Sequence, residues 1–93
     1  MDPFLEKRLR SSGIAALVLA GINTNHCVST TARMAGNLGF RTFVLSDSTV
    51  AYAMRSPASG RLIPAETMHE VGLAELNREF ATILTTDELL SLL

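Results

Sequence analysis

The 93-residue sequence predicts a single α/β domain in which helices cover a parallel sheet. The first observation is a continuous apolar run from Ile14 to Ala20, because a strand buried on both faces shows no alternation of polar and apolar residues. The second is the order of the expected elements, αβαβαβα, which is typical of right-handed crossovers between parallel strands. Apolar residues make up 47% of the chain, so it has the material for a hydrophobic core.

Typical start and stop residues punctuate the first half of the chain. Asp2 is the expected N-cap of the first helix, Pro3 its first residue, and Gly13 its stop. Gly39 ends the second helix, and a run of β-branched and aromatic residues follows it. These signals predict a helix over 3–13, a strand over 14–20, a helix over 27–38 and a strand over 40–45.

The second half begins with a long segment, Thr49 to Ile63, which we expect to be a mobile loop or a functional lid. Pro64 then opens a third helix that is expected to reach about Phe80. Thr85 and Glu88 have the spacing of a capping box at the start of a last helix. The predicted elements are a helix over 64–80, a strand over 81–85 and a helix over 87–92.

Composition excludes several classes of function. The net charge of −1 gives no electrostatic footprint for nucleic acid, and no apolar run approaches the roughly 20 residues that span a bilayer. A single cysteine cannot form an internal disulfide, and the N-terminus lacks the apolar core of a signal peptide. We therefore expect a cytoplasmic protein without nucleic-acid or membrane partners.

Three parallel strands make an incomplete sheet. An apolar edge, expected at the strand over 14–20, stays open unless another chain or a further segment covers it. The sequence therefore predicts a homo-oligomer or a complementing partner segment.

The polar loop after the first strand leads to the chain's one cysteine. Cys27 comes where the second helix is expected to begin, and N–H groups at a helix N-terminus favour a thiolate, which is the nucleophile in cysteine hydrolases. Ligands of open α/β sheets bind beyond the carboxyl ends of the strands, so Cys27 and Asp47 are expected at one edge. A lone cysteine is more often a small buried hydrophobe, and its position alone leaves both interpretations open.

Several motifs agree in order and spacing with a known family. The string GINTNHCVSTTAR, from Gly21 to Arg33, resembles the nucleophile loop of isochorismatase-like cysteine hydrolases, in which Gly-x-x-Thr-Asn-x-Cys precedes Thr-Ala-Arg. The resemblance runs from about Phe4 to the end of the chain, and it implies a three-layer α/β fold with a six-stranded sheet. Further matches are GFR at 39–41 before a strand ending at Asp47, IPAETMH at 63–69, and FATILTTDEL at 80–89.

The resemblance implies a mechanism and its residues. Cys27 is the implied catalytic nucleophile, which attacks the carbon of a small amide or related C–N substrate and forms a covalent intermediate. Backbone N–H groups of Asn23 and Cys27 are the implied oxyanion hole, and a cis peptide is implied between Ile22 and Asn23. Thr24, Asn25 and Asp47 are candidates for lining the substrate pocket.

The chain also departs from the family. The family's triad is Asp, Lys and Cys, and its Asp and Lys belong to the N-terminal half of the complete domain. The Asp/His metal positions of nicotinamidase-like members belong there too, so residues 1–93 are expected to form one partial domain without metal or cofactor. The alternative to a hydrolase is a truncated, non-catalytic half-domain that serves as an assembly or binding module; a redox role for Cys27 is weaker, because no resolving cysteine is present.

Three further residues have two interpretations each. His26 could modulate the neighbouring thiol, but an exposed histidine with a supporting role is favoured. His69 is interpreted as a satisfied core or interface histidine first and a pocket residue second. Asp47 could replace the missing general base, but ordering of the loop after its strand is favoured.

Overall fold

A computed structural model describes residues 3–93 of the chain. Helix α1 spans Pro3–Ser11, and the predicted N-cap Asp2 lies outside the described residues. Gly13, with φ 74°, ends this helix as predicted, and Ile14 N–H donates to the carbonyl of Leu9 at 2.9 Å. The remaining elements are β1 (Ala16–Ile22), the π-helical turn η1 (Thr24–Val28), α2 (Ser29–Asn37), β2 (Arg41–Val50), β3 (Met54–Arg55), β4 (Leu62–Ile63), α3 (Ala65–Leu76), β5 (Thr82–Leu84) and α4 (Thr86–Ser91).

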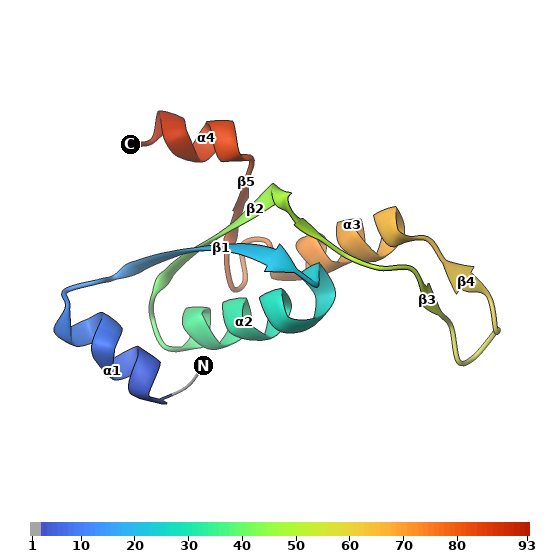
Figure 1. The fold of residues 1–93 in the computed structure, drawn as a ribbon, viewed down its shortest axis with the longest axis horizontal. Helices are drawn as coiled ribbons and strands as arrows, with labels where there is room; N and C mark the ends of the chain where they lie inside the picture. Colours follow the sequence, from blue (N-terminus) through green and yellow to red (C-terminus); the bar gives the residue numbers. More distant parts are fainter. Residues whose placement is uncertain (1–2) are drawn as a thin grey trace.

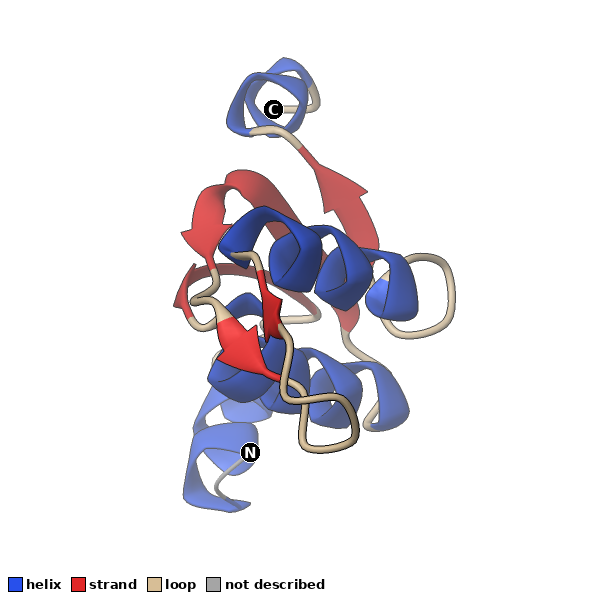
Figure 2. Ribbon diagram, turned by 90° about the vertical axis from the view of Figure 1, so that its right-hand side faces the viewer, coloured by secondary structure: helices blue, strands red, loops and turns tan. Residues whose placement is uncertain are grey.

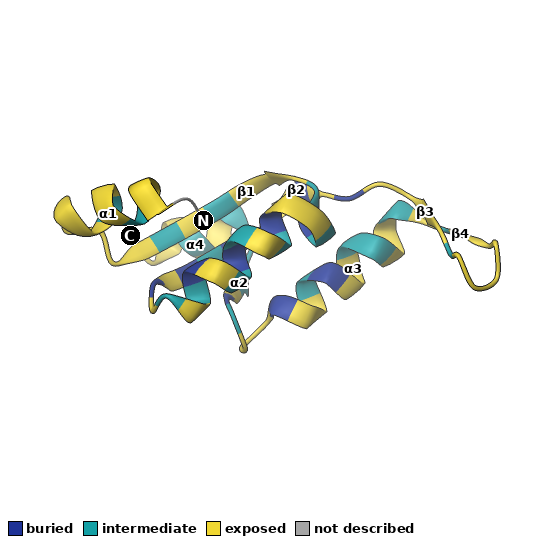
Figure 3. Ribbon diagram, turned by 90° about the horizontal axis from the view of Figure 1, so that it is seen from below, coloured by how far each residue is buried: buried dark blue, intermediate teal, exposed yellow. Residues whose placement is uncertain are grey.

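Three parallel strands form the central sheet, with β2 between β1 and β5 (Figure 1). Helices α2 and α3 cover the same face of this sheet (Figures 1 and 3). The core lies between these helices and the strands, and its buried members are Val28, Ala32, Val44, Leu76 and Ala81. The predicted α/β fold with a parallel sheet is therefore confirmed.

Strand β1 is covered on one face only, which corrects the expectation of burial on both faces. Leu19 packs against the core, whereas the preceding Val18 is 47% exposed. Successive side chains of a strand point to opposite faces, and the core against which Leu19 packs contains Ala32 of α2 and Leu76 of α3. The face of β1 that carries Val18 is therefore not fully buried by the described residues.

Strand β2 is longer than predicted because it continues beside the end of β1. The register shifts between Leu19 and Gly21, after which Gly21 pairs with Thr49 and Ile22 with Val50. The segment over 49–63, predicted to be a loop, contains the short antiparallel hairpin of β3 and β4. This hairpin projects from the body beside the start of α3 (Figures 1 and 2).

Helix α3 ends at Leu76, four residues before the predicted end. Asn77 leaves the helix with φ −63° and ψ 128°, and Arg78 has a positive φ of 73°. N–H groups of Phe80 and Ala81 both donate to the carbonyl of Leu76 at 3.1 Å. The tight reversal lets Phe80 pack against the core, a long-range gain that overrides the local helical pattern.

The reversal also packs closely against α2 at Gly36. A Cβ on Gly36 would stand 2.6 Å from the carbonyl oxygen of Phe80, which is well inside van der Waals contact. Only glycine allows the helix and the turn to approach so closely. Within residues 3–93, no helix is both long and apolar enough to cross a bilayer.

Candidate active site

Cys27 lies in the π-helical turn η1, which joins the carboxyl end of β1 to α2. N–H groups of His26 and Val28 both donate to the carbonyl of Asn23 at 3.1 Å, and the second of these bonds closes the wide turn. Helical geometry therefore starts at Thr24, and α2 itself starts at Ser29. The prediction that a helix begins at Cys27 is corrected, because the cysteine sits inside this turn.

The turn begins directly after a cis peptide bond between Ile22 and Asn23, at the position that the family resemblance implies. Asn23 is extended, with φ −93° and ψ 144°. Its side-chain nitrogen lies 3.1 Å from Nδ1 of His26. An amide nitrogen only donates, so Nδ1 of the exposed His26 is the acceptor, and the ring is directed to Asn23.

Cys27 is exposed, and two hollows border it. The first, of about 180 Å³, is mainly apolar and lies along the end of β1, with Leu19, Ala20, Ile22, Cys27, Val28 and Thr31 as its lining. The second, of about 470 Å³, is lined by Asn25, His26, Cys27, Thr30 and Thr31. The sulfur is therefore accessible from a cleft and is not sealed among aliphatic side chains.

Two side-chain oxygens of the same loop lack a partner. Oδ1 of Asn23 and Oδ1 of Asn25 are buried and accept no hydrogen bond from the residues that the structure describes. The nitrogen of Asn25 donates to the sulfur of Met54 at 3.5 Å, which links the loop to β3. Buried acceptors without donors are costly in free energy. These two oxygens can therefore accept hydrogen bonds from a ligand or from another segment.

Thr24, another of the three predicted pocket residues, is fully buried and bonds to His69 of α3. Its hydroxyl oxygen lies 2.7 Å from Nδ1 of His69, and Nε2 of that ring lies 2.9 Å from the carbonyl oxygen of Ser46. Both ring nitrogens thus have partners, in agreement with the favoured interpretation of His69. No pattern in the sequence predicts this contact, because Thr24 and His69 are 45 positions apart.

The structure does not bring Asp47 into the hollows beside Cys27. Its Oδ1 accepts hydrogen bonds from the N–H and the hydroxyl of Thr86, both at 2.9 Å. These bonds lower the pKa of the Asp47 carboxyl from its ordinary value. Asp47 therefore holds the start of α4, which agrees with a loop-ordering role.

Among residues 3–93, His26 borders the same hollow as Cys27, but no lysine or carboxylate lines either hollow. Lys7, the chain's one lysine, lies on α1 before the start of β1, whereas Cys27 follows the end of that strand (Figure 1). In the part of the chain that the structure describes, no three His, Cys, Asp or Glu side chains are grouped to hold a metal ion.

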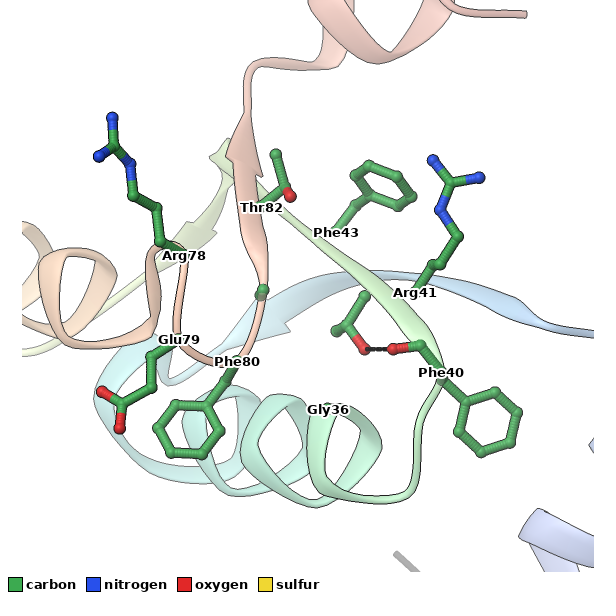
Figure 4. A pocket seen from close by; sticks show the side chains of 10 residues that line it. Gly36, Phe40, Arg41, Phe43, Arg78, Glu79, Phe80 and Thr82 are labelled. Atoms are coloured by element: carbon green, nitrogen blue, oxygen red, sulfur yellow. Dashed lines mark hydrogen bonds between the residues drawn. The ribbon is translucent and has the colours of Figure 1, made fainter.

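Another cavity, of about 310 Å³, lies at the opposite end of the strands (Figure 4). Phe40 and Arg41 from the start of β2 border it, together with Arg78 and Glu79 from the reversal after α3. Parallel sheets bind ligands at the carboxyl ends of their strands, so the hollows beside Cys27 are the candidate active site.

The sequence and the fold are similar to those of known proteins. The model of the isochorismatase domain matches residues 1–88. The uncharacterized isochorismatase family protein YrdC of Bacillus subtilis is 49% identical over 87 residues, which are 94% of this chain and 46% of that protein. Nicotinamidase 3 of Arabidopsis thaliana is 32% identical over 91% of this chain and 37% of its own length.

A solved structure from Chromobacterium violaceum, assigned to hydrolases of the isochorismatase family, matches with a TM-score of 0.90 and 34% identity. The match covers 94% of this chain and 45% of that chain. The chain thus spans less than half the length of these relatives. Since the domain model covers nearly all of the sequence, and the fold is similar to that of a solved family member, the chain belongs to the isochorismatase family of hydrolases.

Proposed function

We propose that this chain is the nucleophile-bearing half of a cysteine hydrolase that acts on a small amide or a related C–N substrate. The observation that carries the proposal is the accessible Cys27, placed in the π-helical turn at the carboxyl end of β1 and bordered by two hollows. The similarity to a nicotinamidase supports an amide as the substrate.

The proposed reaction begins with attack of the Cys27 sulfur on the amide carbon, which forms a C–S bond. The C–N bond then breaks, and the leaving nitrogen takes the proton that the thiol gives up. Water hydrolyses the resulting thioester to a carboxylic acid and restores the thiol. Backbone N–H groups of Asn23 and Cys27 are proposed to bind the oxygen that becomes negative during each attack.

A complementing half is part of this proposal. The family's Asp and Lys have no counterpart beside Cys27 in residues 3–93, and the chain spans less than half of its relatives. The exposed face of β1 and the unpartnered oxygens of Asn23 and Asn25 are where such a half would pack and donate hydrogen bonds. It would supply the base and the cation that the thiol needs.

The test combines this chain with the unmatched half of the Bacillus subtilis relative, as a separate polypeptide. Ammonia release from a panel of small amides, including nicotinamide, is measured for the mixture and for each part alone. We expect hydrolysis by the mixture and none with Cys27→Ala. Equal activity of the Cys27→Ala mixture would refute the role of this sulfur.

A second candidate is a non-catalytic half-domain that serves as an assembly module. The uncovered apolar face of β1 favours it, because such a face binds another chain whether or not chemistry follows. Formation of a stable complex with the second half, without hydrolysis of any amide in the panel, would support this candidate over the hydrolase.

A further inference from the structure

We infer that His69 is a positioning residue for the nucleophile turn: its ring holds Thr24, and through Thr24 it fixes the turn that carries Cys27. The catalytic meaning of this inference rests on the proposed hydrolase function. The contacts that carry it do not, because they lie wholly within this chain.

The proton positions follow from the partners. The carbonyl oxygen of Ser46 can only accept, so Nε2 of His69 must carry a proton and donate it at 2.9 Å. The hydroxyl of Thr24 lies 2.7 Å from Nδ1, and it donates to this nitrogen when Nε2 carries the only proton of the ring. Both nitrogens are occupied, so the ring acts through Thr24 and not on a substrate.

The bond matters because Thr24 has no exposure to solvent. A buried hydroxyl that loses its protein partner cannot turn to bulk water, so removal of the His69 ring leaves it unsatisfied. Thr24 is the first residue of the turn, and the exposed Cys27 lies three residues later. The turn therefore has one anchored end and one reactive, accessible position.

Helix α3 serves as the platform for this anchor. His69 connects it to the nucleophile turn and to β2, and Gly72 lies one helical turn further on. A Cβ on Gly72 would stand 3.4 Å from Cγ2 of Thr24 and 3.3 Å from Cβ of Asn25. The helix backbone thus packs directly on the turn, and the His69 bonds set its register along β2.

Small displacements of reacting atoms are costly in catalysis, which is why supporting groups matter. If His69 fixes the turn, loss of its ring lets Thr24 leave its site and moves the sulfur from its open position between the two hollows. A histidine that only fills space would stabilise the fold without affecting the sulfur. The two roles differ in what they do to the reactivity of a folded protein.

The experiment measures the second-order rate of Cys27 alkylation by iodoacetamide at pH 7 in the 93-residue chain, which has no other cysteine. His69→Phe removes both hydrogen bonds, and Thr24→Val removes the hydroxyl at nearly constant shape. We expect each to lower the rate about three- to tenfold, the factor that matches the one hydrogen bond that both variants lose, between Thr24 and His69. The double variant should react no more slowly than either single variant, because both break one connection.

Conservative and matched variants separate positioning from stability. His69→Gln and Thr24→Ser keep the hydrogen-bonding groups and should recover most of the rate. Thr42→Val removes another buried hydroxyl, which bonds to the carbonyl of Phe40 far from the turn, and should leave the rate unchanged. Circular dichroism and thermal melts confirm that each variant is folded at the assay temperature.

Unchanged alkylation in folded Thr24→Val would overturn the inference, and so would a loss that Thr24→Ser fails to restore. If His69→Phe does not fold, the Thr24 pair and His69→Gln still decide the question. A spectroscopic readout is independent of rates: nitrogen NMR of the ring should show the Nε2–H form in the unmodified chain and a shifted Nδ1 resonance in Thr24→Val. Because no amide hydrolysis is measured, failure of the proposed function leaves these outcomes distinguishable.

Discussion

Asp47 shows how a single carboxylate can be used for structure at the edge where ligands bind. Its two hydrogen bonds from Thr86 join the second half of β2 to the start of α4, where Thr85 and Glu88 form the predicted capping box. The charged form receives both bonds, so its pKa is lowered. Asp47, which the sequence predicts to lie near the nucleophile, therefore stabilises the start of α4 instead.

The first prediction concerns the pH dependence of this bond. A lowered folded-state pKa means that the charged carboxylate stabilises the fold above the unfolded value of 3.8, and that this contribution is lost as the pH falls through the lower folded-state value. Asp47→Asn should lower the unfolding temperature at pH 7 and make it less sensitive to acid below pH 4. Thermal melts across this range check it, with exposed Asp87→Asn as control; equal acid sensitivity of Asp47→Asn and the unmodified chain would contradict it.

Arg78 supplies the second prediction at this scale. Its φ of 73° lies in the left-handed region, which costs a residue with a Cβ about 1–2 kcal/mol, whereas glycine adopts it freely. The greater entropy of glycine in the unfolded chain offsets part of the relieved strain. Arg78→Gly should therefore stabilise the fold by a net of about 0.5–1 kcal/mol. Urea unfolding measures the change, and Arg78→Ala, which keeps the strain, should give no comparable gain.

At the scale of elements, the sequence predicts helix ends correctly where short-range interactions determine them. Gly13, Pro64 and the Thr85 capping box are short-range signals, and the structure confirms each of them near its expected place. The predicted end of α3 at Phe80 is wrong, because the chain reverses at Asn77 and Arg78 and Phe80 packs against the core instead of continuing the helix. Helical spacing in a sequence says nothing about that tertiary gain.

The candidate site also has parts that the sequence predicts and parts that it does not. Cys27 and its loop were found from a family motif, and the position after a strand was found from general rules for parallel sheets. The anchor from Thr24 to His69 and Ser46 was missed, since it joins residues that only the folded chain brings together. Asp47 was predicted at the correct edge, yet its side chain bonds to α4 instead of bordering the cysteine.

The third prediction tests the contact between α2 and the reversal after α3. Gly36→Ala places a methyl group 2.6 Å from a backbone carbonyl of Phe80, which cannot rotate away as a side chain can. We expect a loss of about 1–3 kcal/mol, despite the higher helix propensity of alanine. Gly72→Ala is the matched control, because its nearest neighbour is a side-chain carbon at 3.3 Å. A smaller loss for Gly36→Ala than for Gly72→Ala in urea unfolding would contradict this contact.

At the scale of the whole molecule, the described residues cover one face of the sheet with α2 and α3 (Figure 3) and leave Val18 exposed on the other face. Val18 stands on the open face beside Phe43, its neighbour in the parallel register. Apolar residues in such an arrangement are typical of a surface that another layer covers. This is the surface assigned above to the proposed complementing half.

The fourth prediction follows from that assignment. Val18→Lys places a charge where the second half would bury it, and burial of an unpaired charge is costly. We expect its affinity for the second half to fall by at least about 100-fold, while its circular dichroism stays that of the unmodified chain. Ala58→Lys adds the same charge to the exposed tip of the projecting hairpin and should bind normally. Isothermal titration calorimetry compares the two, and equal affinities would show that this face is not the interface.

The interior formed by Ala32, Val44 and Leu76 closes without help from any other chain, since all three are completely buried within these residues. The turn bearing Cys27, by contrast, stands at the margin of β1, where two halves of a longer enzyme would meet. Mild denaturant should therefore separate the two halves first. The assembled hydrolase would then lose activity at denaturant concentrations that leave the core of this half folded.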